Sequence, residues 1–523
     1  MREEGGTMRR WLRRLGILLL ILVVASCTAL YSYGRFAEAA RGPASMSLPI
    51  AVDATPLDRA IAPLLREHPG RSGMALLQDN LDAFTVRAAT ARAAGRSLDL
   101  QYYIWNQDFT GNLLSYEALR AADRGVRVRL LLDDMTAHGK DSQLAALDAH
   151  ANIEVRLFNP SRSRAGVLGR ASEMLLRPVS MNRRMHNKAW IADGRVAVVG
   201  GRNVGDEYFD AAAQTNFLDL DAVLIGPAVA QAAAIFDDFW NSASVIPLAA
   251  LTTAEKGALE RLRENGDAGY ASAQAGDYVA RLRRSPGVRA LVGGTTLHWL
   301  DDVGVYSDPA SKGQGEGQGQ WLVHRLGRAM GEAKRQLRVI SPYFVPGDEG
   351  ARWLVARRAQ GVDVGVLTNS LAANDVMAVH GGYAPYRVAL LEGGVTLFEL
   401  MPHGEQDSSL FGSSGASLHT KAFVVDDDAG FIGSFNLDPR SVNLNTEMGV
   451  LFRDRGAAAA LLRSYQAKIA PDRSYRVSLK DGALRWEDAS TQPPKVWERE
   501  PEASAWRRWV ARAVGWLPIE SQL

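Results

Sequence analysis

Cysteine is almost absent from this chain: Cys27 is the only one among 523 residues, so an intramolecular disulfide is excluded. Neither sign of charge is in excess, because 60 basic residues against 58 acidic ones leave a formal net charge of +2. This balance gives no general attraction to nucleic acid, and any anion binding must come from local clusters. With 47% hydrophobic and 23% charged residues, the sequence has material for a sizeable core and no sign of wholesale disorder.

The N-terminus carries a basic stretch followed by an apolar run from Leu15 to Ala25, an order typical of an export signal. The run ends in VASC, which resembles a bacterial lipobox, so Cys27 is the predicted lipidation site. The alternative is an uncleaved signal anchor that continues through TALYSY and reaches nearly the ~20 residues that span a bilayer. Either reading predicts a bacterial cell-envelope protein, tethered to the inner or outer membrane on the periplasmic side. The basic residues are Arg9, Arg10, Arg13 and Arg14.

A pattern of strand, helix and second strand occurs twice along the chain. The first copy runs from LDLQYYIW at residue 98 to Asp134, and the second from LRVISPYF at residue 337 to Ser370. Equivalent glycines, Gly125 and Gly361, lie 236 residues apart. An internal repeat of this length is not a solenoid; it predicts two homologous α/β halves.

These patterns divide the chain into five predicted segments. They are a signal or membrane anchor (1–27), a Pro/Ser/Ala-rich linker (28–56), a first half (57–299), a second half (300–480) and a C-terminal tail with an amphipathic helix (481–523). In the tail, SAWRRWVARAVGWLP places tryptophans on one helical face and arginines elsewhere. This pattern favours either an interfacial helix or a helix packed against the protein's own body.

A histidine, lysine and aspartate motif occurs once in each half with the same spacing. In HNKAWIADGRVAVVGGRN, Lys188 and Asp193 follow His186 by two and seven residues, and HTKAFVVDDDAGFIGSFN repeats this spacing 233 residues later. Each copy continues through a close pair of small residues to an asparagine. The second copy comprises His419, Lys421 and Asp426; the downstream residues are Gly201 and Asn203 in the first half, and Ser434 and Asn436 in the second.

Each motif predicts a β-hairpin that presents its histidine and lysine on one face, because residues two apart in a strand point the same way. An ammonium beside an imidazole disfavours a zinc site and favours an anion. Two such hairpins would surround one cavity with two histidines, two lysines and two asparagines. This set suits a phosphodiester: lysine and amide groups stabilise the phosphoryl oxygens, one histidine attacks phosphorus and the other protonates the leaving oxygen.

A nucleophilic imidazole needs an acceptor on its other nitrogen, and each half offers one. Asp219 follows His186 by 33 residues, and Glu447 follows His419 by 28. We therefore expect each half to supply its own orienting carboxylate. Asp193 and Asp426 complete the motif and are expected to stabilise the hairpin turns instead of reacting.

The paired HxKxxxxD motifs resemble those of the phospholipase D superfamily, and HNKAWIADGRVAVVGGRNVGDEYFD and GSFNLDPRSVNLNTEMG are similar to its bacterial cardiolipin synthases of the C type. The resemblance covers roughly residues 75 to 480. It implies two phospholipase D-like α/β/α halves, each a mixed sheet flanked by helices, packed about a pseudo-twofold axis with the active site at their interface. It also implies a two-step mechanism through a phosphohistidine, without metal or cofactor.

By this resemblance His186 is the nucleophile and His419 the general acid. Lys188, Lys421, Asn203, Asn436 and Ser434 would bind phosphate, and Asp219 and Glu447 would orient the histidines. The sequence departs from strict symmetry in two places: Gly201 stands where the second half has Ser434, and Asp219 where it has Glu447.

The predicted reaction is phosphatidyl transfer that makes cardiolipin from phosphatidylglycerol and a second phospholipid, either phosphatidylglycerol or phosphatidylethanolamine. The alternatives are hydrolysis by the same chemistry with water as acceptor, and a non-catalytic lipid-binding envelope protein. The membrane anchor and near-neutral charge disfavour nucleic acid as a substrate. A further loop, residues 161–184, carries six arginines and one acid and is either an anion-collecting lip for lipid headgroups or a solvated loop.

Overall fold

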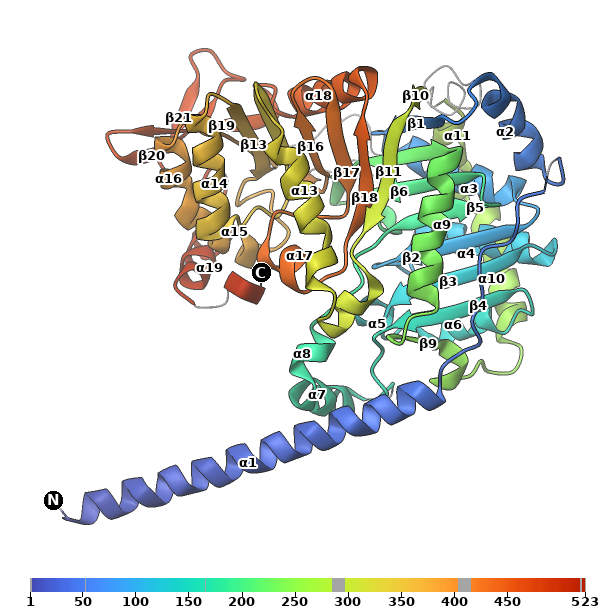
Figure 1. Cartoon of the computed structure of the whole chain (residues 1–523), viewed down its shortest axis with the longest axis horizontal. Coiled ribbons are helices and arrows are strands. Elements are labelled where there is room, and N and C mark those ends of the chain that lie inside the picture. Colours follow the sequence, from blue (N-terminus) through green and yellow to red (C-terminus); the bar gives the residue numbers. More distant parts are fainter. Residues whose placement is uncertain are drawn as a thin grey trace.

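The computed structural model describes residues 2–51, 53–164, 166–284, 297–402, 415–517 and 520–522. They form two α/β halves side by side and one long N-terminal helix that projects from the first half (Figure 1). Each half is a mixed β-sheet with helices against it, so the predicted α/β fold class is confirmed.

The first half is built on a nine-stranded sheet within the described residues, in the order β10-β1-β8-β6-β5-β2-β3-β4-β9. Strands β2, β3 and β4 are parallel, and β5 joins β2 antiparallel. The bounds are β1 (Ser72–Leu77), β2 (Ser97–Tyr102), β3 (Arg127–Asp133), β4 (Ile153–Phe158), β5 (Ala189–Ala192), β6 (Val196–Gly200), β8 (Asp221–Ile225), β9 (Val245–Pro247) and β10 (His298–Leu300).

The second half repeats this core in a ten-stranded sheet of described residues, ordered β11-β18-β17-β16-β12-β13-β14-β19-β20-β21. Its β12, β13 and β14 are parallel, and β16 joins β12 antiparallel, as β5 joins β2. The bounds are β11 (Asp302–Ser307), β12 (Gln336–Ile340), β13 (Asp363–Asn369), β14 (Thr396–Leu400), β16 (Lys421–Val425), β17 (Ala429–Gly433), β18 (Met448–Arg453), β19 (Ser474–Lys480), β20 (Ala483–Asp488) and β21 (Lys495–Trp497).

Helices connect the parallel strands in both halves and cover the outer face of each sheet (Figure 1). Gly125 and Gly361 occupy equivalent places at the ends of two of them, with φ of 92° and 89°, a backbone conformation that glycine adopts without strain. The first half has α2 (Pro56–Glu67), α3 (Asn80–Ala93), α4 (Phe109–Asp123), α5 (Asp134–Ala137), α6 (Asp141–Asp148), α9 (Pro227–Trp240), α10 (Ala258–Ala271) and α11 (Ala273–Arg284); the second has α13 (Leu322–Gly331), α14 (Gly347–Ala359), α15 (Met377–Tyr383), α16 (Arg387–Glu392), α17 (Pro439–Asn443) and α18 (Arg455–Lys468).

Each half has an apolar core of its own, and a third cluster is shared between the two halves. A single cluster of buried side chains includes Val199 of β6, Phe236 of α9, Val450 of β18 and Leu461 of α18. Strands β6 and β18 are in contact, and α9 packs against β11 of the other half. Burial of this apolar surface therefore fixes the relative position of the two sheets. It also fixes the distances between side chains that the two halves bring to their interface.

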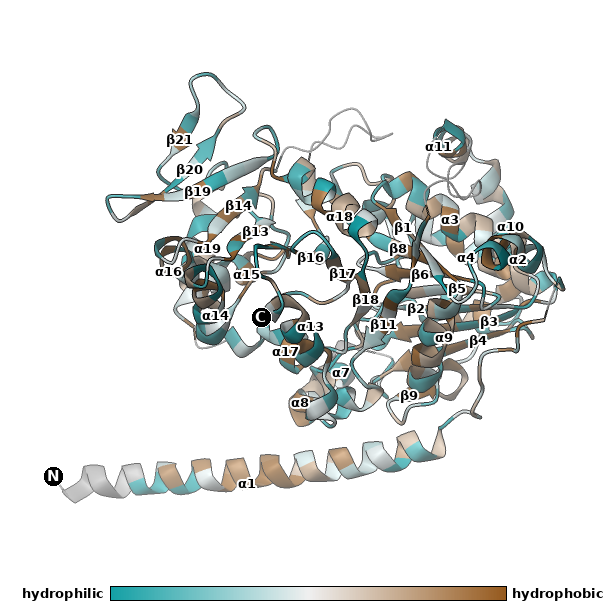
Figure 2. Cartoon of the chain, turned by 45° about the horizontal axis from the view of Figure 1, so that its top comes forward, coloured by the Kyte–Doolittle hydropathy of each residue, from teal (hydrophilic) through white to brown (hydrophobic). Residues whose placement is uncertain are grey.

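Helix α1 (Arg2–Ala39) is hydrophobic through its middle (Figure 2). Its segment Arg9–Ala39 is long and apolar enough to cross a membrane, and its most apolar 18 residues have a mean hydropathy of 2.3. Cys27 is exposed within this helix. A signal sequence has the same properties, so lipidation and uncleaved anchoring both stay predictions.

The predicted linker of residues 28–56 differs from expectation, because much of it is tied to the first half. Helix α1 continues to Ala39, and the extended segment after it is hydrogen-bonded to the body. Arg129 donates to the Ser45 carbonyl (3.0 Å), Arg156 donates to the Pro43 carbonyl (2.7 Å), and the Ser47 amide donates to Asp237 (2.9 Å). Backbone carbonyls of a Pro/Ser-rich stretch satisfy buried arginines here, which composition alone does not reveal.

The predicted amphipathic helix of the tail is present as α19 (Ala505–Gly515). Its small side packs against α15, where a Cβ on Gly381 would lie 2.5 Å from the Ala511 carbonyl. Trp506 and Trp509 of this helix are exposed, and so is Trp516, which directly follows it. Packing against the protein's own body is therefore present, and a role for the tryptophan face at a membrane stays a prediction.

Candidate active site

The two motifs form equivalent hairpins, β5–β6 and β16–β17, and bring His186 and His419 to the interface between the halves. Asp193 and Asp426 stand at the turns with φ of 54° and 50°. Each carboxylate accepts hydrogen bonds from three consecutive backbone N–H groups at the start of the adjacent strand, which is β2 for Asp193 and β12 for Asp426. The donors are Gly95, Arg96 and Ser97 for Asp193, and Lys334, Arg335 and Gln336 for Asp426. Both aspartates stabilise turns, at the opposite end of their strands from the histidines.

Two short parallel pairings between the halves hold the histidines. Strand β7 (Thr215–Leu218) pairs with β15 (Gly415–Leu418), and a single bridge joins Met185 to Thr446. The backbone N–H of His419 donates to the Leu218 carbonyl at 2.9 Å, and that of His186 donates to the Thr446 carbonyl at 2.9 Å. Each histidine is thus pinned to the residue that precedes a carboxylate of the other half.

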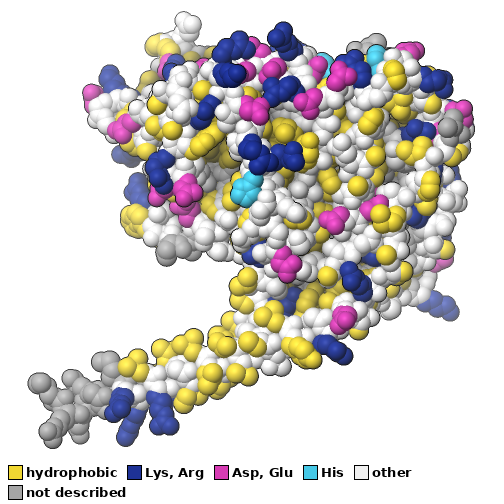
Figure 3. Space-filling model, in the orientation of Figure 1, with side chains coloured by type: hydrophobic (Ala, Val, Ile, Leu, Met, Phe, Trp, Pro, Cys, Tyr) yellow, Lys and Arg dark blue, Asp and Glu magenta, His cyan; other side chains and the backbone are white. Residues whose placement is uncertain are grey.

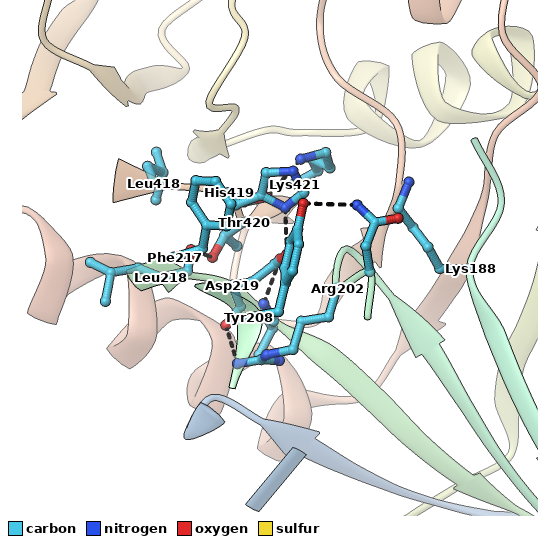
Figure 4. Close-up of polar contacts among 12 residues, drawn as sticks. Lys188, Arg202, Tyr208, Phe217, Leu218, Asp219, Leu418, His419, Thr420 and Lys421 are labelled. Atoms are coloured by element: carbon cyan, nitrogen blue, oxygen red, sulfur yellow. Dashed lines mark hydrogen bonds and ion pairs between the residues drawn. The ribbon is translucent and has the colours of Figure 1, made fainter. Parts of the chain in front are cut away.

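Because of these pairings, each histidine is hydrogen-bonded to the carboxylate of the other half and not to the carboxylate of its own half. His186 Nδ1 lies 2.8 Å from Glu447 Oε2. His419 Nδ1 lies 2.5 Å from Asp219 Oδ2 (Figure 4). The expectation that each half orients its own histidine is therefore wrong, although the four residues are the expected ones. Each reacting group is completed only when both halves are present.

The two lysines are buried beside the histidines, as the motif spacing predicts. Lys188 Nζ donates to the His186 carbonyl and Lys421 Nζ to the His419 carbonyl, both at 2.7 Å, and each residue is 1% exposed. Burial lowers the pKa of both lysines, for Lys188 well below its ordinary value, against the opposing pull of Glu447 and Asp219. A negatively charged group bound beside the two ammonium groups would stabilise their charged forms.

The two asparagines are not equivalent. Asn203 accepts the Ile104 N–H (3.1 Å) and donates to the Tyr208 hydroxyl (2.9 Å), so both ends of its amide are engaged. The Oδ1 atom of Asn436 is buried without a hydrogen-bond partner among the described residues. An unpaired buried amide oxygen is costly, and a ligand hydroxyl would satisfy it.

The two carboxylates differ in their surroundings. Glu447 Oε2 accepts the Ser434 hydroxyl at 2.5 Å, and Oε1 accepts the Ser441 hydroxyl at 2.9 Å. Burial nevertheless raises the pKa of Glu447 to about 7. Burial also opposes ionisation of Asp219, but His419 and then Lys421 outweigh it and lower the pKa of Asp219 to about 2.

The position of Asp219 explains why Gly201 stands where the second half has Ser434. A Cβ on Gly201 would lie 2.2 Å from Asp219 Oδ1, so a serine there has no room. In the second half the corresponding Ser434 hydroxyl is a hydrogen-bond donor to Glu447. The two halves thus pair a glycine with the aspartate and a serine with the glutamate.

Both histidines are enclosed, with 8% of His186 and 6% of His419 exposed. Burial, followed by the nearby lysines, lowers the pKa of both imidazoles, and that of His186 falls well below 6.5. Aromatic rings complete the enclosure: Tyr103 lies edge-on to His186 at 5.1 Å, and Tyr208 lies edge-on to His419 at 5.2 Å.

The repeated motif does not predict these two tyrosines. Tyr103 directly follows β2, and its place at the carboxyl end of a buried parallel strand was the available signal. Among the described residues, no group of three or more His, Cys, Asp or Glu side chains is arranged to hold a metal ion.

Comparison with known proteins identifies the family. The family model described as "Cardiolipin synthase, PLD-like domain" matches residues 88–240 and 326–469, one segment in each half. The chain belongs to this cardiolipin synthase family of phospholipase D-like proteins. It is 41% identical to cardiolipin synthase C of Escherichia coli over 479 residues, which cover 89% of this chain and 99% of that protein.

More distant members and a solved structure agree with this placement. A cardiolipin synthase of Geobacillus kaustophilus is 26% identical over 80% of this chain and 72% of its own length. The crystal structure of phosphatidylserine synthase from Haemophilus influenzae superimposes with a TM-score of 0.55 at 15% identity, over 88% of this chain and 95% of that one. At this identity the likeness concerns the fold.

Proposed function

We propose that this cardiolipin synthase family member transfers a phosphatidyl group from one phospholipid to a glycerol hydroxyl of phosphatidylglycerol, making cardiolipin. The observation that carries the proposal is the pair of buried His–Lys elements at the interface, each histidine hydrogen-bonded to a carboxylate of the other half. The 41% identity to cardiolipin synthase C over nearly the whole of both chains supports the choice of reaction.

In the first step, Nε2 of His186 attacks phosphorus while its Nδ1–H donates to Glu447. The bond from phosphorus to the leaving alcohol oxygen breaks, and that oxygen takes a proton from Nε2 of His419. The product is a phosphatidyl-histidine on His186 and a free alcohol. In the second step His419 takes the proton of the incoming phosphatidylglycerol hydroxyl, whose oxygen attacks phosphorus and releases His186.

The electrostatic difference between the halves supports this division of roles. A nucleophilic imidazole must be neutral, and the pKa of His186 is lowered well below its ordinary value by burial and the lysines. A general acid must carry a proton, and Asp219, ionised with its pKa held near 2, opposes the loss of that proton from His419. Lys188 and Lys421 stabilise the charge that develops on the phosphoryl oxygens.

The enclosure of the histidines supports a lipid hydroxyl over water as the acceptor. Both imidazoles are less than a tenth exposed and lie under aromatic rings. A long-chain lipid bound over the histidines would exclude water during the lifetime of the phosphohistidine. Hydrolysis by the same residues remains the competing outcome that the products must distinguish.

We further propose that the catalytic body lies on the periplasmic side, held by α1 or by lipidation of Cys27. Arginines precede the apolar run, and positive charge favours the cytoplasmic side of a membrane segment. Surface labelling of intact spheroplasts with a membrane-impermeant reagent tests the side. Palmitate labelling of the wild type and of Cys27→Ser tests lipidation.

The reaction is tested with the purified full chain in vesicles of phosphatidylglycerol, with and without phosphatidylethanolamine. We expect cardiolipin as the main product, and its loss in both His186→Ala and His419→Ala. Arg485→Ala, at a partly exposed arginine that pairs with Glu498, serves as a control with unchanged products. Phosphatidic acid as the main product would replace the transferase with a hydrolase, and products unchanged in His186→Ala would overturn the catalytic proposal.

A further inference from the structure

The segment between β4 and β5 carries an exposed apolar patch that the catalytic mechanism does not use. It comprises helices α7 (Val167–Leu176) and α8 (Pro178–Met181). Four large side chains project from it: Leu168 (87% exposed), Met174 (49%), Leu175 (64%) and Val179 (69%). We call these four residues the α7–α8 patch. A cluster of large apolar side chains left in water marks a surface that something else covers.

The α7–α8 patch lies beside the C-terminal end of α1. The Tyr33 hydroxyl of α1 donates to the Pro160 carbonyl at 2.9 Å, and the guanidinium of Arg177 lies 3.2 Å from the centre of the Tyr33 ring. Arg162 lies over the ring of Phe36 at 4.6 Å, and α1 contacts α7 directly. Hydrophobic side chains run along α1 and continue onto the body where the two meet (Figure 3).

This contact fixes the level of the patch relative to a membrane. The apolar run of α1 ends at Ala25, eight residues before Tyr33, which is about 12 Å along a helix. The headgroup layer on each side of a bilayer is roughly 5–8 Å thick. If Cys27 is acylated instead, the acyl chains enter the membrane at a similar distance. With either anchor, the α7–α8 patch lies within reach of the bilayer surface.

The charges around the patch complement an anionic lipid surface. The loop of residues 161–184 contains six arginines and one acid, Glu173, which is paired with Arg177. Several of the arginines are bound within the protein, such as Arg164 to Asp134, so only part of the loop's positive charge is available to an anion. Arg162 remains exposed at the edge of the patch. Exposed apolar residues with an exposed arginine beside them are compatible with an interfacial segment.

The patch is also close to the reacting atoms along the chain. Helix α8 ends at Met181, which is buried, and His186 follows five residues later, at most about 17 Å away. Asn159 ties the connection down by donating to the carbonyls of Ser180 (2.5 Å) and Arg183 (3.0 Å). A displacement of α8 would therefore also displace the segment that holds His186.

We propose that the α7–α8 patch inserts into the interfacial layer of the same bilayer that holds the N-terminal anchor, and so sets the height of the active site above the lipid. The occupant of the patch is an anionic phospholipid surface. The insertion stands on the exposed side chains and the α1 contact; its consequence for catalysis rests on the proposed function.

Insertion is measured in the full chain with Cys27→Ser, which removes the only native thiol. A cysteine placed by Leu175→Cys is labelled with the environment-sensitive fluorophore NBD and reconstituted in phosphatidylglycerol-containing vesicles. Val496→Cys is the matched control, since Val496 is also apolar and exposed (48%) but lies on β21, far from α7 (Figure 1). We expect a blue-shifted emission, quenched by nitroxide-labelled lipid, for Leu175→Cys and neither change for Val496→Cys.

Two results would overturn the proposal. One is equal quenching of both labels by aqueous iodide with no effect of nitroxide lipid. The other is protection of the Leu175→Cys label that depends on protein concentration and not on lipid, which would assign the patch to a second copy of the chain. Neither readout needs catalysis, so failure here is separate from failure of the proposed reaction.

The catalytic consequence is measured with the double variant Leu168→Ser/Leu175→Ser, with Val496→Ser as control. We expect at least a tenfold lower rate on vesicles and an unchanged rate on monomeric short-chain phosphatidylglycerol. Loss of both rates would indicate damage to the His186 segment and contradict a role confined to the membrane surface. Equal rates on vesicles for the double variant and the wild type would also contradict it.

Discussion

At the scale of single residues, the site is a set of paired groups whose members come from opposite halves. Both histidines and both lysines were identifiable from the repeated motif spacing, whereas the two carboxylates lie outside the motif and their orienting role followed from the family resemblance. The pairing of His186 with Glu447 and of His419 with Asp219 was not identifiable. It depends on which strand ends meet between halves, and residues 200 positions apart carry no local signal of that register.

The contact between Asp219 and His419 predicts the direction in which the pH dependence of kcat changes when Asp219 is replaced. Asp219 raises the pKa of His419, which burial lowers. Asp219→Asn removes that charge, so the pKa of His419 falls and the general acid loses its proton at lower pH. We expect the basic limb of the kcat profile to move to lower pH, with kcat reduced about 10²–10⁴-fold. A pH–rate series with the wild type as reference measures both, and a basic limb that stays in place would contradict the pairing.

Gly201 gives a second prediction at this scale. Gly201→Ser places a side chain against Asp219 Oδ1, where a Cβ already lies at 2.2 Å, so Asp219 must move away from His419. We expect at least a tenfold loss of kcat. Ser434→Gly, the reverse exchange, removes only one donor to Glu447 and should cost less. Steady-state rates of the two variants compare them, and equal losses would show that the close approach at Gly201 is unimportant.

At the scale of elements, the sequence predicted the strands and hairpins of both halves because their apolar runs are buried and bounded by turn residues. It did not predict that residues 28–56 are held by Arg129 and Arg156, or that the loop of residues 161–184 contains two helices. Both features are set by contacts with distant side chains. The composition of these two segments predicted a linker and a loop, because it carries no information about the distant residues that they contact.

The hairpin turns give an element-scale prediction. Asp193→Ala removes an acceptor for three backbone N–H groups at the start of β2 without touching either histidine. We expect the free energy of unfolding to fall by about 2–3 kcal/mol, while kcat of the folded enzyme stays near that of the wild type. Chemical denaturation and active-site-normalised rates measure the two quantities. A large loss of kcat at unchanged stability would return Asp193 to the catalytic group.

At the scale of the whole molecule, the internal repeat predicted two homologous halves, and the structure adds a buried core shared between them, beside a core within each half. Val199 of the first half and Val450 of the second belong to the same buried cluster. This shared cluster packs the two halves against each other, although each half also has a core of its own. Repetition in sequence shows the duplication, whereas the shared core depends on which faces of the two sheets are apolar at once.

This architecture predicts the outcome of mixing inactive variants. His186→Ala and His419→Ala each lose one reacting group, and a complete site requires both histidines in the same pair of halves. Because the shared core holds the halves of one chain together, we expect the mixture to have less than about 1% of wild-type activity. Recovery to about a quarter of the wild-type rate would show that halves exchange between chains.

In the proposed mechanism His186 carries the phosphatidyl group, and Glu447 from the other half orients it. The most direct measurement uses a short-chain phosphatidyl ester of p-nitrophenol, whose leaving group needs no general acid, with peptide mass spectrometry after acid-free digestion. In His419→Ala, which lacks the base for the second step, we predict a stable phosphatidyl adduct on the peptide containing His186. An adduct on His419 in the His186→Ala variant, with none on His186 in His419→Ala, would contradict the account.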